Sequence, residues 1–239
     1  MELRIASQGG PPRHARPVPA RGSGAVGSPS ATARRRRREI LDAAIATIAR
    51  HGLSATTFER VADLAKISPG TIVFHFPKKT DLLLATLDDV AAEFEAARKR
   101  VLEETAGRPT EALRRLVNIS LDPSVSAPDK VAVWYAFWGE ANARKVYSQR
   151  VGAYDDAYQS DLVALFEDLI ASGGYRGLDA EAVAFAFAGL LEGLWQEILV
   201  KGRRFDRKAA TGLALAYLAS LFPAHFDMPA GRGKIREDS

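Results

Sequence analysis

The sequence predicts an all-α protein in which an N-terminal unit of three helices precedes a larger C-terminal helical bundle. From residue 35 to residue 221, apolar side chains recur three and four positions apart, which is the period of an amphipathic helix. Residues that cap or break helices divide this pattern into segments. With 239 residues, 47% of them hydrophobic, the chain can bury one or two compact cores.

The composition excludes several classes of site. The chain has no cysteine and therefore no disulfide or thiolate metal ligand, and its four histidines lie too far apart to suggest a metal cluster. We expect no metal and no cofactor. The motifs of nucleotide-binding loops, hydrolase elbows and zinc proteases are missing, so we expect no enzyme. Nothing resembles an apolar run of about eighteen residues, which favours a soluble, cytoplasmic protein without a membrane partner.

The basic charge is concentrated at the N-terminus. Nine arginines and one glutamate give residues 1–38 a charge of +8, so the rest of the chain carries −4 of the net +4. Residues 1–33 are rich in Gly, Pro, Ser and Ala with few large apolar side chains, so we expect a disordered basic tail. The run from Arg34 to Arg38 either binds nucleic acid or stays solvated.

The first two helices follow from apolar spacing and capping signals. Ile40, Ala44 and Ile48 lie four positions apart and Gly52 is a stop signal, which predicts a first helix of about seventeen residues. Thr56 and Glu59 have the spacing of a capping box, so we expect a second helix of about nine residues to begin there. Its apolar stripe comprises Phe58, Val61, Ala62 and Ala65.

A third helix is expected to begin at Ser68. Serine is a good N-cap, and Pro69 suits the first helical position, where its missing N–H has no helical partner. The helix should end near Phe76, because Pro77 disfavours helical geometry in the preceding residue. Two short helices separated by a tight turn, packed on a longer helix that follows arginines, predict a helix-turn-helix within residues 34–80.

The chain here resembles the TetR family of transcriptional regulators. The similarity covers residues 38–84, through REILDAAIATIARHG, ATTFERVADLAKIS, GTIVFHF and the start of PKKTDLLLATL. The resemblance implies an N-terminal DNA-binding domain, an all-helical domain for ligand binding and dimerisation, and usually repression that a small molecule relieves. It departs from the family pattern at Val73, Lys66 and Lys78, where Tyr, Gly and Ser are common. A left-handed Lys66 would cost about 1 kcal/mol.

Each part of this segment has an expected role on DNA. The first turn of the third helix would meet base edges, where Gly70 permits close approach and Thr71 offers a hydroxyl and a methyl group. Other positions would meet phosphates or the minor groove. The predicted DNA-binding residues are Arg35, Arg36, Arg37, Arg38, Thr57, Ser68, Pro69, Gly70, Thr71, Phe74, His75, Lys78 and Lys79. For Phe74, Phe76 and Ile72 the alternative is core packing, and Glu59 is assigned to capping.

The second half predicts a ligand-binding and dimerisation domain over residues 81–222 and a C-terminal tail over residues 223–239. Residues 80–105 form one long connecting helix, and shorter helices are expected at 110–122, 128–142, 144–172, 179–201 and 206–221. The segment 179–200 is apolar nearly all round, which predicts burial on both sides. One side would pack on its own domain, and the other would join the helix at 206–221 in a homodimer interface; the alternative is the central helix of a monomer.

Aromatic residues mark a candidate ligand site. The expected binding residues are Trp134, Phe137, Trp138, Tyr154, Tyr158 and Trp195. The segments VAVWYAFWGEA and GLLEGLW resemble the BetI-type branch of the family, which implies a choline-like quaternary ammonium effector. Aromatic faces bind such cations, and Glu140, Asp155, Asp156 or Glu192 could supply a carboxylate. The alternative is that these aromatics are plain core.

The predicted function is therefore that of a sequence-specific DNA-binding regulator. The resemblance favours a homodimeric repressor that binds a palindromic operator on double-stranded DNA and is released by a small-molecule effector. Two alternatives stay open at the level of sequence. One is a factor of the same fold that binds DNA and recruits proteins without an effector, and the other is an activator.

Overall fold

The computed structural model describes residues 30–228, and their regular structure is entirely helical, as predicted. The helices are α1 (Ala31–Ala55), α2 (Phe58–Ala65), α3 (Pro69–His75), α4 (Lys79–Glu104), α5 (Pro109–Ser120), α6 (Pro128–Gly139), α7 (Ala141–Gly173), α8 (Ala180–Lys201) and α9 (Arg207–Leu221). A short 3-10 turn, Gly202–Arg204, joins α8 to α9. The N-terminal tail predicted for residues 1–33 lies outside the described residues, apart from residues 30–33.

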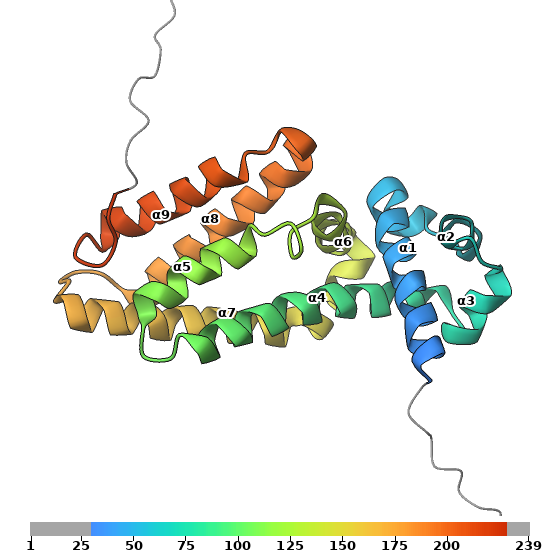
Figure 1. Ribbon diagram of the computed structural model, residues 1–239, viewed down its shortest axis with the longest axis horizontal. Helices are drawn as coiled ribbons and strands as arrows, with labels where there is room; N and C mark the ends of the chain where they lie inside the picture. Colours follow the sequence, from blue (N-terminus) through green and yellow to red (C-terminus); the bar gives the residue numbers. More distant parts are fainter. Residues whose placement is uncertain (1–29, 229–239) are drawn as a thin grey trace, which may run out of the picture.

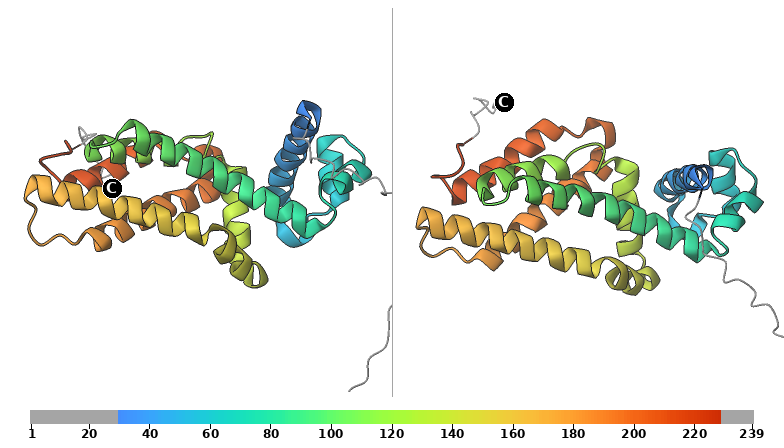
Figure 2. Two further views of the ribbon diagram at one scale, coloured as in Figure 1. Left: turned by 90° about the horizontal axis from the view of Figure 1, so that it is seen from below. Right: turned by 60° about the horizontal axis from the view of Figure 1, so that its bottom comes forward.

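The molecule is elongated, with the helix-turn-helix unit at one end. Helices α1, α2 and α3 gather there, and α4 runs from this unit into the bundle formed with α5, α7, α8 and α9 (Figure 1). Helix α6 lies between the bundle and α1, and the two further views show the same arrangement (Figure 2). The helix-turn-helix unit and the bundle are thus connected through α4 and α6.

Helix α1 begins earlier than the sequence predicted. Ser30 is its N-cap, and the side chain of Ser30 accepts a hydrogen bond from the backbone N–H of Ala33 at 3.2 Å. Residues 31–33, which we expected to be disordered, are therefore helical. Gly52, the predicted stop, has a φ of 76° and kinks the helix without ending it, so α1 continues to Ala55. Glycine tolerates this left-handed geometry because it has no Cβ.

The predicted cap of α2 is displaced by one residue. Thr57 is the N-cap, and its hydroxyl accepts from the backbone N–H of Arg60 at 3.3 Å. Thr56 is buried, and its hydroxyl donates to the carbonyl oxygen of Gly52 at 2.8 Å. The expected capping box of Thr56 with Glu59 is therefore wrong, since the hydroxyl of Thr56 is used by the kink in α1.

Helix α3 forms as expected. Ser68 caps it by accepting from the backbone N–H of Thr71 at 3.3 Å, with Pro69 in the first turn. The turn before it passes through Lys66, whose φ of 54° is left-handed as anticipated. Ile72 and Phe76, with 0% and 3% of their surface exposed, belong to a core shared by α1, α2, α3 and α4. Core packing is therefore confirmed for these two side chains.

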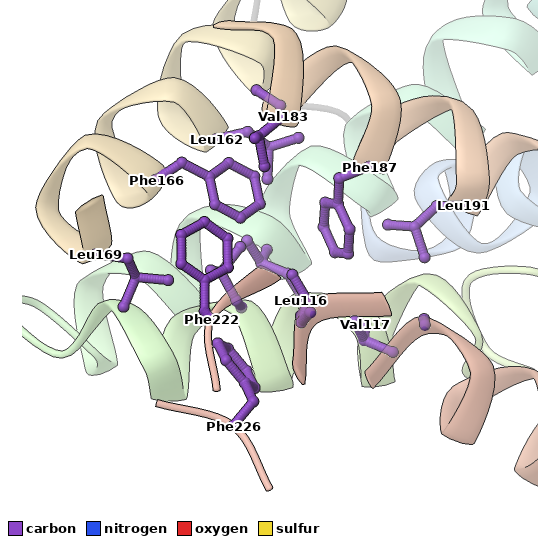
Figure 3. Packing of buried hydrophobic residues seen from close by; sticks show 14 of the residues in the cluster. Leu116, Val117, Leu162, Phe166, Leu169, Val183, Phe187, Leu191, Phe222 and Phe226 are labelled. Atoms are coloured by element: carbon purple, nitrogen blue, oxygen red, sulfur yellow. The ribbon is translucent and has the colours of Figure 1, made fainter. Parts of the chain in front are cut away.

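The core of the bundle contains a cluster of aromatic rings that pack edge to face and stacked. The centroid of Phe166 lies 5.6 Å from that of Phe187 and 5.6 Å from that of Phe222 (Figure 3). Phe226 is buried in the same cluster, and the guanidinium of Arg114 lies 4.9 Å from its ring centroid. The predicted C-terminal tail from residue 223 is thus wrong up to Phe226, because this part of the chain covers the end of the core.

The outward face of α8 is apolar and exposed in the single chain. In the single chain Phe185 and Val200 of α8 are 77% and 75% exposed, and Leu213 of α9 is 51% exposed. The predicted burial of this face against a second subunit stays a prediction, because the structure contains one chain. Residues Ala180–Arg204, with a mean hydropathy of 1.5, are also long and apolar enough to match a membrane span by length and composition, contrary to the sequence-based prediction. The same properties are common to core helices of soluble proteins.

Candidate functional site

The N-terminus of α3 presents an exposed edge to solvent. Ser68, Pro69 and Gly70 are exposed, and the hydroxyl oxygens of Ser68 and Thr71 lie 3.0 Å apart. A Cβ added at Gly70 would meet only the hydroxyl oxygen of Ser68, at 3.8 Å, so the fold itself does not require glycine there. An absent side chain at an exposed helix start suits the close approach of an outside partner.

Aromatic and basic side chains continue this edge. Phe74 is 83% exposed, so core packing is wrong for this residue, and its ring packs edge-on against His75 with 5.3 Å between centroids. Lys78 is exposed at the N-cap of α4. Lys79 is engaged within the chain, since its Nζ donates to the carbonyl oxygen of Ser54 at 2.7 Å. To contact a phosphate, the Lys79 ammonium would have to bind the phosphate in addition to the carbonyl oxygen of Ser54 or in place of it.

The arginine run occupies the first turns of α1. Arg35 and Arg36 both pair with Glu39, at 3.6 Å and 2.6 Å between charged atoms. The guanidinium of Arg37 lies 5.2 Å from the ring centroid of Phe76, at the end of α3. Arg37 thus brings positive charge next to α3, while Glu39 compensates part of the charge of Arg35 and Arg36.

Arg38 connects two helices, a role that the sequence did not reveal. Its Nη1 donates to both carboxylate oxygens of Asp89 on α4, at 3.0 and 2.8 Å, and its Nη2 pairs with Asp42 at 2.9 Å. Burial raises the pKa of Asp89, although the attraction of Arg38 opposes this shift. The clamp fixes the start of α1 against α4, so Arg38 has a structural use within the predicted DNA-binding run.

A second site lies inside the C-terminal bundle. A cavity of about 400 Å³ opens between α4, α5, α6, α7 and α8. Its aromatic lining consists of Phe94, Trp134, Tyr135, Trp138, Tyr147, Tyr158, Phe185 and Trp195. All three tryptophans of the chain are therefore in the wall of one cavity.

The aromatic rings of this cavity pack against one another, and one of them is fixed by a hydrogen bond. Trp195 lies 6.3 Å from Trp134 and 5.7 Å from Phe94, measured between ring centroids, and Trp134 lies 6.0 Å from Tyr147. The indole N–H of Trp195 donates to the carbonyl oxygen of Ser120 at 2.7 Å. This hydrogen bond fixes the Trp195 ring, so that the cavity wall is formed before any ligand arrives.

Two carboxylates add negative charge to this wall. Asp155 of α7 and Glu192 of α8 both line the cavity. Partial burial of its carboxyl group, together with the neighbouring carboxylates Asp156 and Glu192, raises the pKa of Asp155 to about 6. Burial and the negative charges of Asp155 and Glu192 also raise the pKa of Tyr147 above its usual value. An aromatic wall with crowded carboxylates disfavours anions and favours a cation.

The structure brings four of the six predicted ligand residues together and places two elsewhere. Trp134, Trp138, Tyr158 and Trp195 line the cavity. Phe137 is 3% exposed and packs in a core with side chains of α1, α4 and α7. Tyr154 is 39% exposed on α7 and is not part of the cavity wall.

Among the candidate carboxylates, Asp155 and Glu192 reach the cavity and the other two do not. Glu140 instead accepts a hydrogen bond from the hydroxyl of Ser54 at 3.0 Å, and Asp156 lies beside the site. Sequence reasoning missed Phe94 and Tyr135 as wall residues. The long helix that contains Phe94 was predicted. The side chains that Phe94 contacts depend on how α4 packs in three dimensions.

Helix α6 has two faces with different neighbours. Trp134, Tyr135 and Trp138 face the cavity. Val133 and Phe137 are buried against α1 and α4, in a cluster that includes Ile48 and Leu53 of α1. A ligand that displaces α6 would therefore act directly on α1, which packs against the other helices of the helix-turn-helix unit.

Comparison with known proteins agrees with both halves of this description. Residues 40–94 match the family model of the bacterial regulatory proteins of the tetR family, and residues 109–223 match that of the BetI-type transcriptional repressor, C-terminal. The HTH-type transcriptional regulator BetI of Paraburkholderia phymatum is 31% identical over 183 residues, which cover 77% of this chain and 91% of that protein. The BetI regulator of Burkholderia thailandensis is 30% identical with the same coverage of 77% and 91%.

Solved structures give the same fold. A protein from Saccharomonospora viridis assigned as a transcriptional regulator, solved in complex with choline, is 28% identical with a TM-score of 0.59, covering 76% of this chain and 94% of that one. A TetR regulator from Haloarcula marismortui superposes with a TM-score of 0.65 at 22% identity, covering 79% of this chain and 98% of that one. The chain therefore belongs to the TetR family of DNA-binding transcriptional regulators, with a C-terminal domain of the BetI type.

Proposed function

We propose that the protein is a cytoplasmic, homodimeric repressor that leaves its operator when a quaternary ammonium compound of the choline class fills the aromatic cavity. The observation that carries this proposal is the cavity itself, in which Trp134, Trp138 and Trp195 meet Asp155 and Glu192. The choline bound by the related Saccharomonospora viridis protein supports the same ligand class.

The cavity suits a permanently charged ammonium group better than a neutral or anionic ligand. Aromatic faces attract a cation within about 6 Å of the ring centroid, most strongly when water is excluded. The rings around Trp195 and Trp134 are spaced 5.7–6.3 Å apart, so that several faces can contact one methylated nitrogen. Methyl groups bury apolar surface against the same rings, and the two carboxylates balance the charge.

The link from the cavity to DNA runs through α6. A ligand that separates Trp134 and Trp195 would move α6, whose other face holds Phe137 against α1 and α4. Helix α4 continues into the recognition unit, so its movement changes the separation of the two recognition helices in a dimer. We propose that this separation matches the operator in the empty protein and is lost in the liganded one.

The dimer would form through the apolar outward faces of α8 and α9. Phe185, Val200 and Leu213 are exposed there in a single chain. Two such faces related by a two-fold axis make a four-helix interface, and a two-fold axis calls for a palindromic operator with half-sites on one face of the DNA. A footprint over a single short half-site would contradict this arrangement.

Fluorescence anisotropy on the DNA upstream of the gene tests the proposal. The complex is titrated with choline, with betaine aldehyde and with 3,3-dimethylbutan-1-ol, an uncharged isostere of choline. We expect both ammonium compounds to lower the anisotropy and the isostere to have no effect. Tight binding to the operator that none of the three compounds changes would leave the DNA-binding function in place and reject the effector.

We expect Thr71→Ala to lower affinity for the preferred operator about fivefold, which corresponds to about 1 kcal/mol for one hydrogen-bonding contact at a base edge. Thr71 lies in the first turn of α3, where base contacts are made. Affinity for unrelated DNA should stay the same. The matched variant Thr71→Ser keeps the hydroxyl and loses the methyl group, so it separates the two contributions in a gel-shift series.

The contrasting variant is Lys79→Ala. A phosphate contact carries no sequence information, so we expect weaker binding to every DNA tested and a salt dependence whose slope is smaller by about 1. Lys79 begins α4 and is held near Ser54 by its hydrogen bond. If the variant lost its preference for the operator over other DNA while the slope of the salt dependence stayed the same, Lys79 would contact bases or only stabilise the fold.

Effector binding should weaken as the pH falls. Asp155 has a raised pKa of about 6, so it is ionised above that pH and neutral below it. The charge of choline does not change with pH, and the ionised carboxylate is the form that attracts it. We expect the Kd for choline to rise about tenfold between pH 7.5 and pH 5 as the carboxylate is protonated. Asp155→Asn should bind weakly at both pH values.

A further inference from the structure

The mouth of the aromatic cavity overlaps the outward face of α8. Phe185, Gly189 and Glu192 all line the cavity, and all three are exposed in the single chain. They lie three and four positions apart, and therefore on one stripe of the helix. The same stripe continues along the helix to Gln196 and Val200, which are exposed and do not line the cavity.

One part of this stripe thus belongs to the cavity wall, while Val200, farther along α8, and Leu213 of α9 are exposed apolar side chains outside it. Phe185 shows this most clearly, because its ring lines the cavity and yet is 77% exposed. On the α6 side of the cavity, Trp138 is 54% exposed. An apolar ligand site with such open walls is incomplete, since ligand pockets bury most of the surface of their ligand.

We propose that the second copy of the chain closes this cavity, so that the complete effector site exists only in the dimer. The inference rests on the proposed α8–α9 dimer and adds that the partner's surface covers the mouth beside Phe185 and Glu192. An exposed phenylalanine next to a cavity needs an apolar cover, and a two-fold contact of the α8 stripe with itself provides one.

This arrangement links effector binding to dimerisation. If the effector binds the closed site of the dimer more tightly than the open site of a single chain, it must strengthen the dimer by the same factor. The effector would then act by changing the geometry of an intact dimer, and release from DNA would occur without dissociation into monomers. Closure also removes water from the aromatic faces, which strengthens their attraction for a cation.

The three tryptophans make a test possible without any ligand, because all of them line the cavity. Acrylamide quenching of the intrinsic fluorescence is measured for the full chain as a dimer. It is measured again for Val200→Glu/Leu213→Glu, which places charges on the outward faces of α8 and α9 but away from the cavity wall. The control is Leu64→Glu, which changes an exposed leucine of α2 in the DNA-binding unit.

We expect the quenching constant to be about twofold larger for the monomeric variant than for the dimer and the control, because a packed interface excludes the quencher. Light scattering gives the oligomeric state, and circular dichroism checks the fold. If the variant does not fold, dilution of the unmodified protein through its dimer dissociation provides the same comparison. Equal quenching of monomer and dimer overturns the inference. In a dimer that resists dissociation, quenching of Trp138 at the level of a freely exposed indole overturns it as well.

The outcome is separate from that of the proposed effector. Closure of the cavity without any response to choline would keep the inference and reject the ligand class. A choline response with the same Kd in monomer and dimer would keep the effector and reject closure by the partner.

Discussion

Replacing Arg98 by alanine is expected to lower the free energy of unfolding by about 3–5 kcal/mol, because it removes the buried partner of the buried carboxylate of Glu95. Arg98 is 2% exposed in the bundle. Its Nε and Nη2 donate to one carboxylate oxygen of Glu95 at 2.8 and 2.6 Å, and its Nη1 pairs with Asp161. Burial tends to raise the pKa of Glu95, but the hydrogen bonds from Arg98 and Lys99 hold it below its usual value.

The control for this variant is Lys99→Ala. Lys99 pairs with the same carboxylate group at 3.1 Å, but its side chain is 62% exposed, so we expect a change of less than about 1 kcal/mol. Chemical denaturation followed by circular dichroism measures both variants. Equal midpoints for the two variants would show that the buried position of Arg98 adds nothing to the pair.

Trp134→Leu is expected to weaken choline binding about 30-fold, which corresponds to about 2 kcal/mol for a desolvated cation–π contact. Leucine keeps an apolar side chain against Trp195 and Tyr147 but removes the aromatic face. Operator affinity without effector should stay within about twofold, since Val133 and Phe137, the buried side chains of α6 in the cluster with α1, are unchanged. Trp134→Phe keeps an aromatic ring and should recover part of the affinity.

Tyr154→Ala is the matched control for the cavity. Tyr154 is an exposed aromatic on α7 outside the cavity wall, so we expect no change in the choline concentration that releases the operator. Isothermal titration with choline and anisotropy on the operator measure these variants. An equal loss for Trp134→Leu and Tyr154→Ala would indicate that the effector binds elsewhere.

The helices themselves could be predicted from the sequence because local signals determine them. Ser68 and Pro69 define the start of α3 in any context, and the left-handed Lys66 follows from the length of the turn. The predicted start of α2 was wrong because two neighbouring residues could both cap the helix. Thr56 and Thr57 are both good caps, and the kink at Gly52 decides between them by using the hydroxyl of Thr56.

The candidate effector site was only partly predictable, because helical spacing gives a face but not its neighbour. Trp134 and Trp138 lie four positions apart and do share a face, whereas Phe137, three positions from Trp134, is buried in the neighbouring core with α1 and α4. Phe94 reaches the cavity from α4, more than thirty positions away along the chain. The ion pair between Arg38 and Asp89 could not be predicted either, because the two residues are 51 positions apart in the sequence. Such contacts depend on how the helices pack.

The most direct test compares the affinity of choline for the free protein with its affinity for the protein bound to its operator. Fluorescence of the three cavity tryptophans reports binding in both states. Linkage requires that choline bind more weakly to the operator complex, by the same factor by which choline weakens operator binding. We expect this factor to be at least about tenfold, the range of allosteric coupling. Equal choline affinities in the two states would show that the aromatic cavity does not control DNA binding.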